Sequence, residues 1–125
     1  MQNDKASEIM KSIKTAVKKK MGNESTYFIT SNVNDDPNHK SFQFEFLAYD
    51  YFWVGIEYDK GLVTAYINSG ENKVEISLED WWEKIILSDW IEQLDSELRL
   101  RIPDKYLDAK GWNNKSNIVP SSEEL

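Results

Sequence analysis

The sequence predicts an α+β fold: an N-terminal helix, an antiparallel meander of four to five strands, and C-terminal helices packed on the sheet. Two segments with apolar residues at helical spacing flank a central region in which apolar and polar residues alternate. Short turn sequences separate the alternating segments, so consecutive strands should pair with one another. We expect one domain over residues 1–112 and a flexible polar tail over residues 113–125.

The first helix is predicted from an apolar stripe at three- and four-residue steps. Its members are Ala6, Ile9, Met10, Ile13, Ala16, Val17 and Met21. Lys18, Lys19 and Lys20 fall in the expected last turn, where cations interact favourably with the helix dipole. Gly22 follows them and is a suitable stop.

The strands are predicted from β-branched and aromatic residues and from alternation with a period of two. They are expected over residues 26–30, 41–49, 51–58 and 62–68, with a short last strand at Val74 and Ile76. Phe42, Phe44 and Phe46 share one face of the second strand and should point into the core. Asp59, Lys60 and Gly61 predict a tight hairpin turn.

A long helix is expected directly after the last strand. Ser77 is a favourable N-cap, and Asp80 stands three residues later as a shorter form of the capping-box acid. The apolar face of this helix would comprise Trp81, Trp82, Ile85, Ile86, Trp90, Ile91, Leu94 and Leu98. Alternatively, Ser88 and Asp89 cap a second helix. A short helix over residues 103–110 should follow and end at Gly111.

The charge is distributed unevenly along the chain. Residues 1–34 carry six basic and three acidic side chains, whereas residues 35–125 carry nine basic and nineteen acidic ones. The net charge of −7 argues against a nucleic-acid partner, and no apolar run has the length of a membrane span. The chain lacks cysteine and an N-terminal secretion pattern, which fits a cytoplasmic protein.

No sequence motif predicts catalysis. His39 is the only histidine and lies in an expected loop, and neither a Gly-x-Ser-x-Gly elbow nor a phosphate-binding glycine loop is present. The acidic segments 34–36 and 68–72 lack the EF-hand pattern and are better explained as turns. We therefore predict no enzyme, no cofactor and no metal. A small hydrolase with paired carboxylates stays a third hypothesis because the chain has 22 acids.

The second face of the predicted sheet mixes aromatic and acidic residues. It would carry Gln43, Glu45, Leu47, Tyr49, Tyr51, Trp53 and Glu57. Such a composition suits a basic partner surface that excludes water on contact. One of the adjacent tryptophans Trp81 and Trp82 could add an exposed anchor, although core packing explains both more simply. If the terminal helices covered both sides of the sheet, this surface would be buried.

The chain resembles, as a type, bacterial toxin-immunity proteins of the kind paired with contact-dependent inhibition or other polymorphic toxins. The resemblance spans roughly residues 1–112 and rests on a small, acidic, cysteine-free α+β domain. Within it, Leu78-Glu79-Asp80-Trp81-Trp82 opens the expected long helix and Leu98-Arg99-Leu100-Arg101-Ile102-Pro103 follows it. The resemblance implies tight binding to a cognate toxin domain, often a basic nuclease, and neutralisation by covering its active site or substrate surface.

The expected partner-binding residues are acids that accelerate encounter and aromatics that slow dissociation. Glu79, Asp80 and Glu83 come first, because they would share one end of a helix. The full set is Glu79, Asp80, Glu83, Asp50, Glu57, Asp59, Tyr51 and Trp53. The alternative function is an acidic secretion-type chaperone that holds an effector segment as a dimer. Such chaperones usually insert a helix between strands, and the sequence predicts none, so we expect a monomer.

Overall fold

The computed structural model describes residues 4–68 and 72–112. Along the chain it contains α1 (Ala6–Met21), the 3-10 helix η1 (Gly22–Glu24), β1 (Ser25–Asn34), β2 (Ser41–Ala48), β3 (Phe52–Asp59), β4 (Leu62–Asn68), β5 (Lys73–Trp81), α2 (Leu87–Leu100) and α3 (Asp104–Lys110). The five strands form one antiparallel sheet in the order β1-β2-β3-β4-β5. The predicted α+β class and meander are confirmed. The tail expected over residues 113–125 lies outside the described residues.

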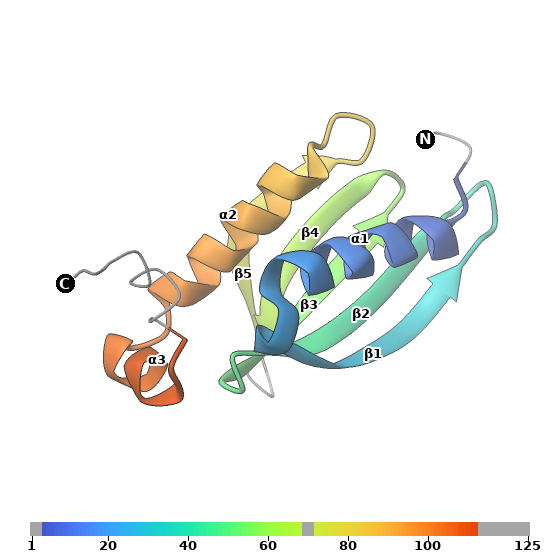
Figure 1. The fold of residues 1–125 in the computed structure, drawn as a ribbon. Coiled ribbons are helices and arrows are strands. Elements are labelled where there is room, and N and C mark those ends of the chain that lie inside the picture. The colour runs from blue at the N-terminus through green and yellow to red at the C-terminus, as the bar shows by residue number, and fades with distance from the viewer. Residues whose placement is uncertain (1–3, 69–71, 113–125) are drawn as a thin grey trace.

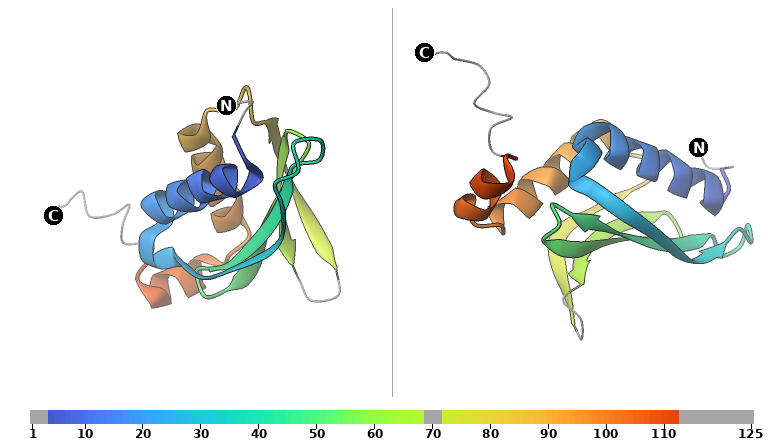
Figure 2. Two further views of the ribbon diagram at one scale, coloured as in Figure 1. Left: turned by 90° about the vertical axis from the view of Figure 1, so that its right-hand side faces the viewer. Right: turned by 60° about the horizontal axis from the view of Figure 1, so that its bottom comes forward.

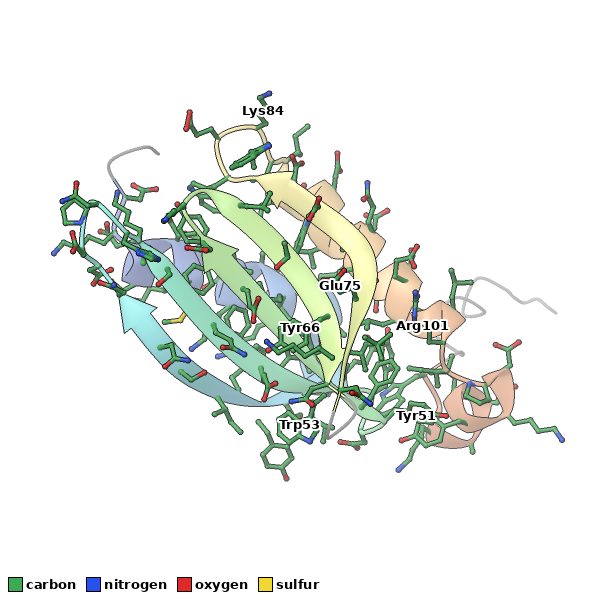
Figure 3. The ribbon with its side chains drawn as sticks, turned by 180° about the vertical axis from the view of Figure 1, so that it is seen from behind. Tyr51, Trp53, Tyr66, Glu75, Lys84 and Arg101 are labelled. Carbon is green, nitrogen blue, oxygen red and sulfur yellow. The ribbon has the colours of Figure 1, made fainter. Side chains whose placement is uncertain are left out.

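Both long helices cover the same face of the sheet. Helix α1 runs along the β1–β2 side and α2 along the β4–β5 side, while α3 lies near the turn between β2 and β3 (Figure 1, Figure 2). Seen from behind, the sheet bears side chains but no helix of the described chain (Figure 3). Among the helices within the described ranges, none has the length and apolar character needed to cross a bilayer.

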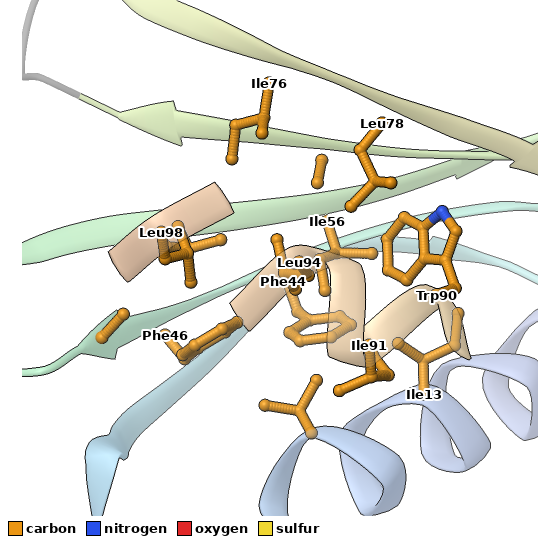
Figure 4. Close-up of a cluster of buried hydrophobic side chains, with 14 of the residues drawn as sticks. Ile13, Phe44, Phe46, Ile56, Ile76, Leu78, Trp90, Ile91, Leu94 and Leu98 are labelled. Atoms are coloured by element: carbon orange, nitrogen blue, oxygen red, sulfur yellow. The ribbon is translucent and has the colours of Figure 1, made fainter. Parts of the chain in front are cut away.

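The hydrophobic core fills the layer between these helices and the sheet. Along β2 every second residue is buried, and Phe44 and Phe46 are fully enclosed, as their alternation predicts. They pack with Ile13 of α1 and with Leu94 and Leu98 of α2 (Figure 4). Each fully buried side chain of this size stabilises the fold by about 1.5–3 kcal/mol relative to an exposed one.

The N-terminus of α1 is capped by a carboxylate from the β1–β2 loop. The Ser7 amide donates to Oδ1 of Asp35 at 2.8 Å, and the Ser7 hydroxyl donates to Oδ2 at 3.0 Å. These hydrogen bonds, led by the amide, lower the pKa of Asp35. The acidic loop thus satisfies helix amides that have no partner within the helix. At the other end, the helix stops at Gly22 as expected, with φ of 55°.

The prediction that a helix begins at Ser77 is wrong. Strand β5 continues to Trp81, and α2 begins only at Leu87, with Ile86 as its N-cap. The physical reason is the length of β4: Val63 pairs with Asp80, and Thr64 pairs with Glu79. A helix here would have left that end of β4 without a partner strand, so tertiary pairing overrides the local capping sequence.

The extension of β5 depends on a bulge. Ala65 of β4 lies opposite three residues of β5, 76–78, so Ile76 and Leu78 both reach the core. Trp81, the last residue of β5, is 51% exposed, whereas the adjacent Trp82 is buried. The short C-terminal helix agrees with the sequence, since α3 ends at Gly111 in the left-handed conformation.

Tyr49 joins the β2–β3 turn to the helical layer. The sequence placed it on the second face of the sheet, but β2 ends at Ala48 and Tyr49 has φ of 55°, which turns its side chain into the interior. Its hydroxyl donates to the Asp95 carboxylate and accepts from Arg99 Nη1 at 3.2 Å. On α3, the Tyr106 hydroxyl lies 2.9 Å from the Tyr49 carbonyl oxygen. One buried side chain thus connects the sheet with α2.

This arrangement predicts an alkaline limit to stability. Burial, and then the hydrogen bond to Asp95, raise the pKa of Tyr49 above its ordinary value. The folded protein therefore holds this proton more tightly than the unfolded chain, so the stabilisation is complete below about pH 10 and is lost as the pH rises beyond it. Urea unfolding between neutral pH and pH 11 should show this fall.

In Tyr49→Phe the decline in unfolding free energy should be shallower than in the parent protein. It should not vanish, because burial also raises the pKa values of Tyr58 and Tyr66. An unchanged slope in Tyr49→Phe would mean that Tyr49 ionises normally in the folded protein.

Candidate protein-binding surface

We call the sheet surface that faces away from α1 and α2 the open face. Residues directly opposite each other in an antiparallel sheet point to the same side, and side chains two residues apart share a face. By this register the open face of β2–β5 comprises Ser41, Gln43, Glu45, Leu47, Trp53, Gly55, Glu57, Asp59, Leu62, Thr64, Tyr66, Asn68, Lys73, Glu75, Glu79 and Trp81. Tyr66 lies over its middle, with Glu75 beside it and Trp53 towards one end (Figure 3).

The open face is strongly acidic. It holds five carboxylates and a single ammonium group, that of Lys73, and therefore has a net charge of −4. The carboxylates are Glu45, Glu57, Asp59, Glu75 and Glu79. They come from β2, β3 and β5 of one sheet, so their potentials add over one continuous surface.

The centre of the open face is a fixed aromatic ring. The Tyr66 ring lies against Gly55 so closely that a Cβ there would be 2.0 Å from its Cζ atom. The Tyr66 hydroxyl accepts a hydrogen bond from the Gln43 amide and donates to Glu45 at 3.4 Å. Asn68 Nδ2 donates to the same Glu45 oxygen at 2.8 Å. The ring is thus held by packing from below and by hydrogen bonds at its edge.

A cation already rests on this ring. Lys73 Nζ lies 4.5 Å from the Tyr66 ring centroid and donates to Glu57 Oε2 at 2.8 Å. The hydrogen bond to Glu57 raises the pKa of Lys73, while burial raises the pKa of Tyr66, so at neutral pH an ammonium faces a neutral phenol. Glu75 and Glu79 line the same shallow pocket of about 250 Å³. The site therefore holds a positive charge between an aromatic face and carboxylates.

Tryptophans mark the two ends of the open face. Trp53 is half-buried and pairs with Asn68 at the end where β5 begins. Trp81 pairs with Leu62 at the opposite end, where its ring lies over Gly61 of the β3–β4 hairpin. Large aromatic side chains at the margins of a polar surface can provide apolar contact area for a partner.

The structure distributes the expected partner-binding residues over several surfaces. Trp53, Glu57, Asp59 and Glu79 lie on the open face. Asp50 lies in the β2–β3 turn beside Tyr51, whose ring packs at 4.7 Å on that of Tyr106 in α3. These two residues therefore belong to the α3 end of the molecule.

Glu79, Asp80 and Glu83 do not share a helix end, contrary to our prediction. Asp80 pairs with Val63, whose side chain is buried, so it points towards the helical side, opposite to Glu79. Glu83 lies in the turn after β5 and lines a different pocket, with Tyr58 and Trp82. The expected binding set omits Tyr66, Lys73 and Glu75, and extension of the period-two pattern through residues 73–81 would have revealed the last two.

Within the described ranges, no group of three or more histidine and acidic side chains is placed to hold a metal ion. His39 Nε2 lies 3.3 Å from Asp59 Oδ1, with both side chains more than half exposed. Comparison with models of known protein families, with curated proteins and with solved structures gave no match. The open face is accordingly interpreted from its own geometry and charge.

The contact between Tyr66 and Gly55 predicts a coupled effect on stability. In Gly55→Ala the new methyl group would overlap the ring, and overpacking of this kind typically lowers the unfolding free energy by about 1–3 kcal/mol. In a Tyr66→Ala background the space is vacant, so the same substitution should have a much smaller effect. Urea unfolding of the four proteins measures this coupling. Additive effects would show that the ring does not occupy the space above Gly55.

Proposed function

We propose that this protein is a binding protein of the toxin-immunity type, which neutralises a basic toxin domain by covering it with the open face. The supporting observation is the combination on one helix-free sheet surface of five carboxylates with one ammonium group, with tryptophans at its two ends. An antiparallel sheet exposed on one side needs only polar residues there, so solubility alone does not require this bias of sign or these large aromatics.

The negative charge would act before contact. A surface of one sign steers a partner of the opposite sign and raises the association rate, and this effect weakens as salt screens the charges. The groove between β5 and α2 extends the same field, since Asp89, Glu92 and Glu97 line it in a volume of about 430 Å³. A basic domain that approaches the β5 edge would meet acids of both the open face and α2.

The centre of the open face would act after contact. Tyr66 is fixed by Gly55, Gln43 and Glu45, so it loses little conformational freedom when a partner binds. Lys73 occupies the position over this ring that a cationic side chain of the partner could take. A partner arginine there would stack on the phenol and pair with the surrounding glutamates.

The meander favours this proposal over a secretion-type chaperone. In the described residues, no helix lies between β2 and β5, whereas the chaperone pattern usually has one. We therefore propose a monomer that binds one folded partner. The third hypothesis, a hydrolase with paired carboxylates, receives no specific support from the open face, because its acids are arrayed over a surface.

The proposal predicts that charge reversal on the open face slows association. The partner to test is the C-terminal domain of the protein encoded immediately upstream of this chain in its genome. For Glu75→Lys/Glu79→Lys, biolayer interferometry should give an association rate at least about tenfold lower, with a smaller change in the dissociation rate. The difference should shrink as salt is raised towards ~1 M.

A matched control carries the same change of charge elsewhere. Asp104→Lys/Asp108→Lys alters two exposed acids of α3, away from the open face, and should change the association rate much less. The proposal fails if the upstream product does not bind, or if the two double variants affect association equally.

A further inference from the structure

The two edges of the sheet are protected to different degrees. An edge strand presents unpaired amide and carbonyl groups, and natural proteins commonly block such an edge with charged side chains or proline. Edge strand β5 carries Lys73, Glu75, Glu79 and Asp80 and contains the large bulge. Edge strand β1 has ten residues and neither a charged residue nor a proline among them. Only the β1 edge is therefore chemically suited to accept another strand.

Two irregularities limit the part of β1 that can pair. The register against β2 shifts between Thr26 and Ile29 and again between Ser31 and Asn34. Tyr27 and Asn32 within these shifts have positive φ values of 53° and 57°. Between them, residues 29–31 pair regularly with β2. The usable edge is therefore short and is centred on residues 28–31.

Two lysines of α1 lie over this short segment. Lys14 Nζ donates to the Thr30 hydroxyl, and Lys18 Nζ lies 4.7 Å from the Phe28 ring centroid. In the part of the chain that the structure describes, no carboxylate forms an ion pair with either lysine. Burial and then the neighbouring charge of Lys18 lower the pKa of Lys14, as expected for a cation without a compensating anion.

The other side of the same segment carries one large apolar residue, Ile29, and the small polar residue Ser31. Ile29 pairs with Glu45, so it points to the open-face side of the sheet, and 53% of its surface is exposed. Tyr27 and Val33 flank it with exposed fractions of 71% and 40%. A strand added to β1 would thus have ammonium groups above one face and the exposed Ile29 side chain beside the other.

We propose that the outer edge of β1 at residues 28–31 pairs with a short extended segment of a partner protein in which acidic and apolar residues alternate. Successive side chains of a strand point to opposite faces. The carboxylates would reach Lys14 and Lys18, and the apolar side chains would cover Ile29. Main-chain hydrogen bonds to the edge would provide the remaining affinity, as in other cases of strand addition.

Charge favours such a segment over a second copy of this chain. Two copies joined through β1 about a two-fold axis would bring the lysines of both α1 helices towards one junction, with like charges facing each other. The short regular stretch would also give few strand hydrogen bonds for a ten-residue strand. This inference goes beyond the proposed function, because it concerns the β1 edge of the sheet, not the open face, and a ligand of opposite charge.

Fluorescence anisotropy with a fluorescein-labelled peptide of alternating glutamate and valine tests the inference. The peptide should bind, and a peptide of alternating lysine and valine should bind at least about tenfold more weakly. Lys14→Glu/Lys18→Glu should weaken binding of the glutamate peptide by a similar factor. The exposed single variant Lys18→Glu provides the same test without disturbing the contact between Lys14 and Thr30.

Two further measurements make the result specific. The control variant Lys105→Glu/Lys110→Glu changes the charge equally on α3 and should retain peptide binding. Hydrogen exchange should slow at amides of residues 28–31 when the glutamate peptide is present. Absence of binding, equal affinity for both peptides, or protection confined to another element would overturn the inference. A dimer detected by light scattering would also overturn it if hydrogen exchange at residues 28–31 were slow without peptide.

Discussion

The burial of two helices against one face of a single sheet determines the character of every other surface. Helices α1 and α2 enclose Phe44, Phe46 and Ile56 between them and the strands, and this layer contains most of the apolar core. Because the strands alternate, each buried side chain commits its neighbours to the opposite side of the sheet. The open face is therefore a consequence of core packing, and the helical layer does not cover its side chains.

The open face combines two properties that are usually in conflict. Its acids repel one another and favour a hydrated surface, whereas recognition requires groups held in a defined arrangement. Because Gly55 has no side chain, the Tyr66 ring packs directly against the backbone. Gln43 and Glu45 form hydrogen bonds with its hydroxyl. Lys73 then offsets part of the central charge. The result is a rigid centre within a negatively charged surround.

Most of the fold could be predicted from local pattern, and the failures have a common cause. The first helix, the strand from Ser41 and the hairpin at Gly61 follow from periodicity and turn residues within a few positions of each other. The end of β5 depends instead on how far β4 extends, which no local sequence states. The same holds for the site: Glu57 and Trp53 follow from alternation, whereas the place of Tyr66 requires knowing that Gly55 lies opposite.

Over residues 4–68 and 72–112, the separation of charge produces an electric dipole moment. Helix α1 carries five lysines and lies on the β1–β2 side, where Lys14 and Lys18 contact β1, while the acids of the open face and of α2 lie towards the sheet surface and β5. In the field of a charged body such a molecule experiences a torque as well as an attraction. It would turn its acidic side towards a cationic surface during approach, so that fewer collisions are wasted in unproductive orientations.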